Sequence, residues 1–279
     1  MKTIFRSLVL LAVIAPTVFL SSCGGDDTTT TPSTPTNECV IATDSSTDGT
    51  TIVTANSNNQ ITGVSDAFLN ASFISAGDST YFTFNEDTIQ IREVFYKNGS
   101  NWAKSVQTVS FQDPAIQGAT IQTITTTTPT YNSGKISNLR AVAVNGIKVG
   151  TVFTSIGTST TDYAFTYNTD GNITRVASTN DGSSVNYNFT YASNTVSKAN
   201  VFLFDNAFSA ALPMNFLPVV LGYFVPFNKM ITKMDYPDGS ITFSNVTTDA
   251  KNNVSRYTMT GTGDESGNSG KVKTTYVCK

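Results

Sequence analysis

The chain has 279 residues and a formal net charge of -3, with 17 Lys and Arg against 20 Asp and Glu. Charged residues make up 13% of it, about half of the usual share in a soluble domain. No block of Lys and Arg is present, which argues against nucleic-acid binding, because phosphate contacts need clustered basic side chains. The chain has no His, which excludes imidazole catalysis and imidazole metal ligands.

Residues 1–22 have the pattern of a secretory signal peptide. Lys2 and Arg6 form a basic start, and residues 8–20 carry no charge. That stretch is too short to cross a bilayer comfortably, but it is typical of the apolar core of a signal peptide. It ends in Leu-Ser-Ser-Cys at Cys23, which resembles the bacterial lipobox, where the cysteine after the cleavage site carries a lipid. An ordinary secretory signal with an incidental cysteine is the alternative.

Residues 23–37 are expected to form a lipidated tether. The acidic pair Asp26 and Asp27 resembles the surface-export signal of Bacteroidetes-type lipoproteins. This resemblance implies the outer membrane, with the cell surface as one of the two faces left open. Residues 28–36 read TTTTPSTPT, a composition that cannot bury apolar surface and favours an extended chain. The sequence therefore predicts a domain anchored to the membrane through lipid on Cys23.

The other two cysteines, Cys39 and Cys278, stand at the two ends of the expected folded region. An exported chain meets an oxidising compartment, and the termini of a domain are often close together. We therefore expect a disulfide between Cys39 and Cys278, with two unpaired thiols as the alternative. By chain entropy alone, such a bridge would stabilise the fold by at most about 5 kcal/mol.

Residues 38–279 predict a single all-β domain. Residues 162–167 and 186–191 alternate between aromatic and polar side chains, which is the period of a half-buried strand. We expect an antiparallel meander of many hairpins, about 13 to 16 strands, in a barrel-like or curled sheet. Asn-Gly or Asp-Gly pairs, which favour tight hairpin turns, end at Gly49, Gly99, Gly146, Gly171, Gly182 and Gly239.

A loose repeat runs through the second half of the chain. It reads as an aromatic-x-aromatic pair, a polar turn and then Ile-x-x-apolar, and it occurs at residues 165–176, 187–198, 234–243 and 243–257. These YxYxxDGxI units resemble the YD-like repeats of Bacteroidetes-type outer-membrane lipoproteins of unknown function. They are similar to a domain-of-unknown-function family described as having a porin-like fold. The likeness covers about residues 160–278, implies a barrel-like sheet and carries no catalytic residues.

One segment interrupts the strand pattern. Residues 206–228 carry no charge and contain three prolines, which make a continuous membrane helix improbable. We expect a short apolar insertion that plugs one end or face of the sheet. The alternatives are a lid over an apolar pocket and a membrane or partner patch.

Tyr96 and Trp102 are the candidate ligand-binding pair. They flank residues 97–101, and across a hairpin they could form an exposed stacking platform for a sugar. Alternatively the pair packs the hairpin, which is the interpretation that we favour.

No pattern in the sequence points to a catalytic, cofactor-binding or metal-binding residue. Glu93 and Asp162 are the acids expected inside strands, and nothing in the sequence brings them together. We therefore expect a non-enzymatic binding or structural module of the cell envelope, with a glycan or an envelope protein as partner and no cofactor. The alternative is a carboxylate-dependent glycan hydrolase, which would need two acids about 5 to 10 Å apart in one cleft.

Overall fold

The described part of the computed structural model begins at Cys39. The signal and tether expected at residues 1–37 lie outside the described residues, and so does the expected insertion at 206–228 except for its last two positions. No helix in the described part is long and apolar enough to cross a membrane. The described backbone covers residues 39–46, 49–55, 61–65, 70–76, 79–86, 88–99, 101–112, 118–195, 227–263 and 269–278.

Sixteen β-strands run through the described residues. The first eight are β1 (Cys39–Ser46), β2 (Gly49–Ala55), β3 (Ile61–Ser65), β4 (Asn70–Ala76), β5 (Ser79–Glu86), β6 (Ile89–Asn98), β7 (Asn101–Phe111) and β8 (Ala119–Asn132). The others are β9 (Lys135–Val149), β10 (Val152–Tyr167), β11 (Ile173–Asn180), β12 (Ser183–Thr195), β13 (Lys229–Tyr236), β14 (Gly239–Thr248), β15 (Val254–Gly263) and β16 (Gly270–Cys278).

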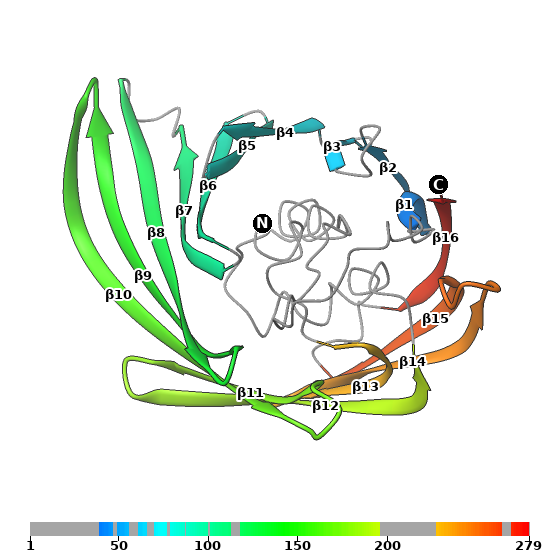
Figure 1. The fold of residues 1–279 in the computed structure, drawn as a ribbon. Coiled ribbons are helices and arrows are strands. Elements are labelled where there is room, and N and C mark those ends of the chain that lie inside the picture. Colours follow the sequence, from blue (N-terminus) through cyan, green and yellow to red (C-terminus); the bar gives the residue numbers. More distant parts are fainter. Residues whose placement is uncertain are drawn as a thin grey trace, which may run out of the picture.

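The strands form one antiparallel meander, in which each strand pairs with its neighbours in the sequence. β1 pairs with β16 as well as with β2, so the sheet closes into a barrel (Figure 1). The prediction of an all-β, barrel-like meander of many hairpins is confirmed.

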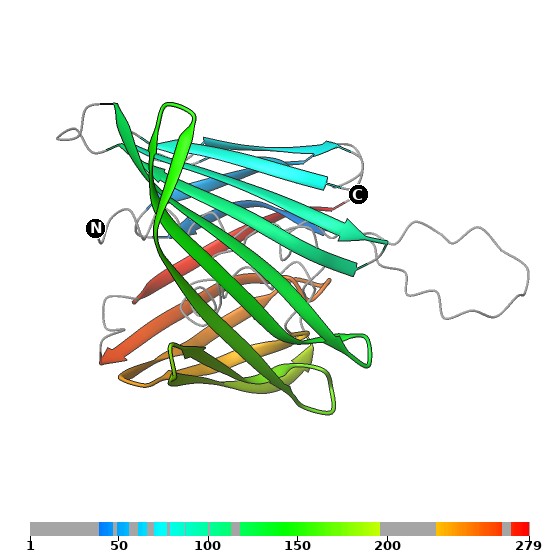
Figure 2. The ribbon, with the colours of Figure 1, turned by 90° about the vertical axis from the view of Figure 1, so that its left-hand side faces the viewer.

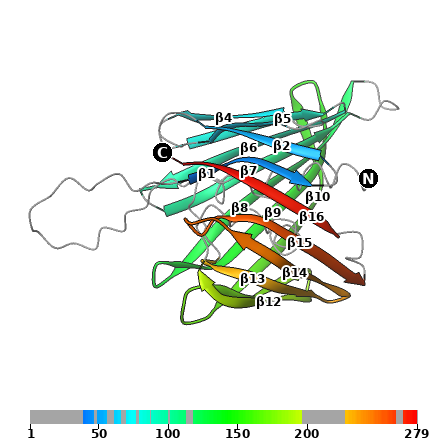
Figure 3. The same cartoon turned by 90° about the vertical axis from the view of Figure 1, so that its right-hand side faces the viewer.

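Because the strands are antiparallel, the hairpins fall into two sets at the two rims of the barrel. We call the rim where β1 begins and β16 ends the N-terminal rim, and the other the opposite rim. The β8–β9 and β10–β11 connections lie at the N-terminal rim, and the β9–β10 connection lies at the opposite rim (Figure 2). Seen from the other side, β1 and β16 run next to each other along the wall (Figure 3).

The two faces of the sheet differ in polarity. On β6, Ile91 and Phe95 are buried, whereas Arg92 and Tyr96, which point to the other face, are exposed. Side chains converge on the concave side of a closed sheet, so the buried apolar row faces the inside of the barrel and the polar row faces outward. The largest fully buried members of the inner face are Trp102, Phe82, Phe84, Phe95, Phe227, Ile91 and Ile173.

One of the expected turns is wrong. Gly146 lies inside β9, and the turn that ends this strand is formed four residues later, at Gly150, where φ is +58°. Gly146 serves close packing instead, because a Cβ there would come within 2.5 Å of a carbon of the Phe153 ring. Gly171 does have the positive φ expected of it, +83°.

Tyrosines on the inner face tie neighbouring strands together near the N-terminal rim. Tyr131 Oη donates to the carbonyl of Trp102 at 3.0 Å, and Tyr167 Oη donates to that of Ile136 at 2.7 Å. In both pairs a tyrosine late in an even strand reaches the start of the preceding strand. The same arrangement joins Tyr191 to Ile173 and Tyr276 to Val254. Burial raises the pKa of Tyr131, Tyr167 and Tyr191 above the ordinary value.

Two loops at the N-terminal rim share one hydrogen-bond pattern. In the β10–β11 loop, the amide of Asn172 donates to Asn168 Oδ1 at 2.9 Å, and Asn172 is fully buried. In the β14–β15 loop, the amide of Asn253 donates to Asp249 Oδ1 at 2.9 Å, and Asn253 is 1% exposed. Each asparagine is followed by the residue whose carbonyl accepts a tyrosine hydroxyl.

The likeness between these loops extends into the strands. Arg175 pairs with Asn188 across β11 and β12, and Arg256 pairs with Lys273 across β15 and β16, at equivalent positions of the register. One strand further on, Tyr191 pairs with Ile231 and Tyr276 pairs with Ile41. The unit β10–β13 is therefore matched by β14, β15, β16 and β1, across the closure of the barrel.

Candidate functional site

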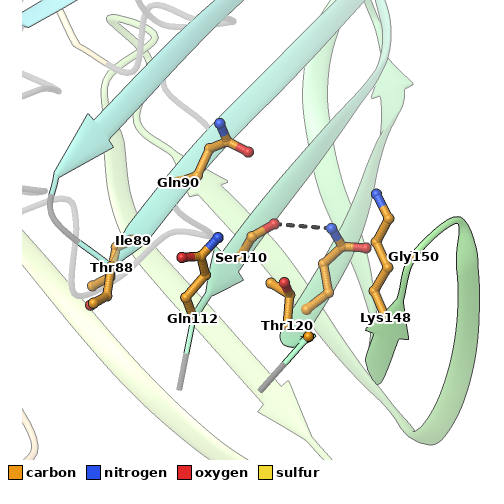
Figure 4. Close-up of a pocket in the computed structure, with 10 residues that line it drawn as sticks. Thr88, Ile89, Gln90, Ser110, Gln112, Thr120, Lys148 and Gly150 are labelled. Atoms are coloured by element: carbon orange, nitrogen blue, oxygen red, sulfur yellow. Dashed lines mark hydrogen bonds between the residues drawn. The ribbon is translucent and has the colours of Figure 1, made fainter. Parts of the chain in front are cut away.

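A polar groove lies at the opposite rim, where it is built by the ends of β6, β7, β8 and β9. Its volume is about 430 Å³. Figure 4 shows its side chains, which come from four consecutive strands and the turns between them. We call it the glutamine groove. Its lining residues are Thr88, Ile89, Gln90, Ser110, Gln112, Gly118, Thr120, Gln122, Lys148 and Gly150.

The register of the sheet places three groove residues in one row. Gln90 lies opposite Ser110, and Ser110 lies opposite Gln122. Gln122 Nε2 donates to Ser110 Oγ at 3.0 Å, which fixes the orientation of this amide and leaves its carbonyl oxygen available (Figure 4). Next along the rim, the amide of Gln112 donates to the carbonyl of Thr88 at 2.9 Å, which extends the β6–β7 ladder into the groove.

An aromatic ring lies beside the polar row. Gln122 pairs with Gly146 on β9, and the ring of Phe153 covers the position where a Cβ of Gly146 would stand. Phe153 itself pairs with Lys148, a lining residue of the groove. The missing side chain at Gly146 thus leaves room for the ring of Phe153 on the strand next to Gln122.

The groove has the chemistry of a site for a polar, uncharged ligand. Among the described residues that line the groove, none is an acid, and Lys148 is the one charged member. Three glutamine amides and the hydroxyls of Ser and Thr provide both donors and acceptors. Such groups can bind hydroxyls of a ligand.

The candidate pair Tyr96 and Trp102 does not form an exposed platform. Trp102 lies opposite Lys97 and is 2% exposed, and Tyr96 lies opposite Lys104 and is 36% exposed. The two rings therefore point to opposite faces of the sheet, an arrangement that does not give the two-ring sugar platform, which was the less favoured interpretation. A register shift at Tyr96/Lys97 sends Trp102 into the core, where it packs the hairpin. Tyr96 instead carries Lys104 Nζ 4.8 Å above the centre of its ring.

The structure describes the two cysteines of the candidate disulfide but not the candidate lipidation site. Cys39 and Cys278 face each other directly in the β1–β16 ladder. Opposed residues in an antiparallel pair have Cα atoms about 4.5 to 5.5 Å apart, within the range of about 4.4 to 6.8 Å found for disulfides. The bridge stays a prediction that this register favours. Cys23 lies outside the described residues.

The two acids considered for catalysis are not close neighbours in the fold. Glu93 is buried on the inner face of β6, and Asp162 is on the outer face of β10, where it lies 4.0 Å from Arg140. These two carboxylates therefore cannot flank one scissile bond. No group of three or more potential metal ligands occurs among the residues that the structure describes.

Sequence reasoning missed the glutamine groove. Its residues come from four strands, and none belongs to a motif. The usable signal was the density of Gln and Thr at the strand ends on either side of residues 112–118, combined with Gly146 inside a strand.

Comparisons with known proteins support the fold alone. No protein-family model matches the chain, and no match was found among curated proteins. Among solved structures, the chain is similar to a porin-like protein from Bacteroides vulgatus ATCC 8482, with a TM-score of 0.59 and 9% sequence identity. The match covers 85% of this chain and 99% of that one. The chain therefore has a fold similar to that of a porin-like Bacteroides protein.

Proposed function

We propose that this protein is a lipid-anchored, non-catalytic binding module of the cell envelope, and that the glutamine groove binds a polar glycan. The observation that carries this proposal is the lining of the groove, in which the described residues gather three glutamine amides with Ser and Thr hydroxyls. A glycan presents neutral hydroxyls in several directions, and glutamine amides can both donate to them and accept from them. The ring of Phe153, which covers Gly146 opposite Gln122, is an apolar surface of the kind that packs against a sugar.

The polarity of the barrel's outer face supports an anchored protein rather than one whose strands cross the bilayer. Barrels that cross a membrane carry an apolar band on their outer face. Here the outer face carries exposed charged side chains in the middle of strands, including Arg140, Asp162 and Arg175. The proposed location is therefore the aqueous side of the outer membrane, with lipid on Cys23 as the anchor.

The binding proposal is tested with the chain from residue 23 onward, carrying Cys23→Ala so that no lipid contributes. The protein is screened against neutral polysaccharides by isothermal titration calorimetry. Gln90→Ala combined with Gln122→Ala should weaken binding at least tenfold, because two amides of one row are lost. Asn188→Ala, an exposed amide on the outer face of β12, is the matched control and should bind as the parent does.

Binding that survives loss of both glutamines, or that falls equally with Asn188→Ala, would remove the groove from the proposal. Anchoring is tested separately by fractionation of cells. Cys23→Ala in the full-length protein should move it out of the membrane fraction and abolish incorporation of labelled fatty acid.

A further inference from the structure

A basic cluster on the outer face of β15 and β16 is the charged patch that the proposed function leaves unexplained. Arg256 and Lys273 lie directly opposite each other, and Lys271 lies one diagonal step away, opposite Thr258. All three side chains are exposed. Like charges that face each other across strands destabilise a sheet, so this arrangement needs a reason outside the fold.

The cluster has no acidic partner among the described residues. The three ion pairs there join Arg140 to Asp162, Lys229 to Asp170 and Lys233 to Asp235. Arg92 and Lys104 lie over the rings of Tyr81 and Tyr96. With the residues that the structure describes, Arg256, Lys271 and Lys273 make neither kind of contact, although the chain as a whole has a net charge of -3.

The equivalent hairpin carries one cation where this cluster carries three. In β11–β12, Arg175 occupies the position of Arg256, and its guanidinium donates to Asn186 Oδ1 through Nε at 2.9 Å and Nη2 at 2.6 Å. By the matched registers, Asn186 corresponds to Lys271 and Asn188 to Lys273. Arg175 is thus held by an amide, whereas the equivalent Arg256 has two further cations, Lys271 and Lys273, as its neighbours.

We propose that Arg256, Lys271 and Lys273 form a docking surface for a membrane that carries anionic phosphate headgroups. Guanidinium and ammonium groups together bind phosphate oxygens well, and each basic side chain near an anionic bilayer strengthens attachment. The position of the cluster favours a membrane as its occupant. β16 pairs with β1, whose first residue, Cys39, follows the expected tether at the N-terminal rim.

This inference rests on the anchoring part of the proposed function, because the tether brings the N-terminal rim toward the bilayer. Arg256 is the third residue of β15, counted from that rim, and Lys273 is opposite it. The cluster then touches headgroups while the lipid holds the chain. It does not involve the glutamine groove, whose residues lie at the opposite rim.

The test measures binding to vesicles without help from the lipid anchor. The chain from residue 23 onward, with Cys23→Ala, is sedimented with phosphatidylcholine vesicles that contain about 30% phosphatidylglycerol. Lys271→Asn combined with Lys273→Asn should lower the partition coefficient about thirtyfold, because each basic residue contributes about 1 kcal/mol and 1.4 kcal/mol is tenfold. Binding of the parent should fall as salt is raised from 50 to 300 mM, since the Debye length shortens over about this range.

The double variant should fold normally, because Asn occupies both positions in the equivalent hairpin. Its unfolding midpoint should be unchanged or higher, since repulsion with Arg256 is removed. Lys104→Asn combined with Lys233→Asn removes the same charge elsewhere on the outer face and is the matched control. Its partition coefficient should stay within about threefold of the parent's, which is less than the effect of removing one basic residue that touches the bilayer.

Three results would overturn the inference. The first is equal binding to vesicles of pure phosphatidylcholine. The second is an equal loss in the control variant, which would indicate a general charge effect. The third is loss of vesicle binding on adding inorganic phosphate at matched ionic strength, which would assign the cluster to a small anion. Glycan binding by Lys271→Asn/Lys273→Asn is measured in parallel. It tests the glutamine groove independently, so a failed prediction of vesicle binding can be told apart from a failed prediction of glycan binding.

Discussion

Asn172 offers a sharp test of how the rim loops hold the barrel together. Its side chain is fully buried, and Oδ1 accepts the backbone amides of Asn228 at 2.6 Å and Lys229 at 3.2 Å. Lys229 begins β13, so one amide side chain in the β10–β11 loop fixes the point where the chain enters a strand two places away. Asn172→Ala removes both bonds and leaves two backbone donors without this acceptor.

The expected loss in the free energy of unfolding is about 2 to 4 kcal/mol, because a buried donor left unpaired costs about 1 to 3 kcal/mol. Asn253→Ala is the matched control, since Asn253 occupies the same position in the β14–β15 loop. Within the described part of the chain, Asn253 Oδ1 has no hydrogen-bond partner, and its Nδ2 donates to Asp249 Oδ2 at 3.0 Å. Its loss should cost only about 1 to 2 kcal/mol.

Urea denaturation followed by tyrosine and tryptophan fluorescence measures both values on the same protein. A drop in the thermal midpoint of about 5 to 12 °C should accompany Asn172→Ala. Equal losses for the two variants would refute the reasoning, because Asn253 Oδ1 would then have to accept amides of its own. The register places the equivalent amide at the start of β1, at Cys39.

Three further predictions concern other parts of the fold. Gly171→Val should destabilise by about 1 to 3 kcal/mol in urea denaturation, because φ is +83° there; an unchanged midpoint would contradict this strain. Thiol titration of the unfolded, non-reduced chain with Cys23→Ala should find no free thiol if Cys39 and Cys278 are bridged, and two would exclude the bridge. Burial, with help from nearby Tyr187, raises the pKa of Tyr163 to about 12, so its stabilising contribution is complete below pH 10 and lost between about pH 10 and 12. Tyr163→Phe should reduce that loss, and titration of Tyr163 near pH 10 by ultraviolet absorbance in the folded protein would contradict it.

The fold class was predictable because the alternation of side chains is local. Tyr163, Phe165 and Tyr167 all point to the buried face, as their spacing indicates. Closure was not predictable, since it depends on pairing between Cys39–Ser46 and Gly270–Cys278, which are far apart in the sequence. Gly146 misled the turn prediction because an Asn-Gly pair inside a long strand has the same local sequence as a hairpin turn.

The candidate site was less predictable than the fold. Tyr96 and Trp102 were expected to face each other, but a single register shift in the hairpin places them on opposite faces. Register is set by the whole ladder, and a one-residue slip moves every side chain to the other face. The glutamine groove depends on the same ladder, because Gln90, Ser110 and Gln122 are neighbours only through the register of three strands.

The placement of the two proposed surfaces follows from the antiparallel order of the strands, in which odd-numbered and even-numbered strands run in opposite directions. A chain that enters β1 at one rim must return to that rim after every second strand, so the β14–β15 loop and the end of β16 lie beside the entry point. The glutamine groove is built from the β5–β6, β7–β8 and β9–β10 connections, which all lie at the opposite rim. A tether attached at the N-terminal rim would therefore hold the basic cluster near the bilayer and present the groove away from it. The two surfaces should be separable by mutation, because no strand contributes residues to both.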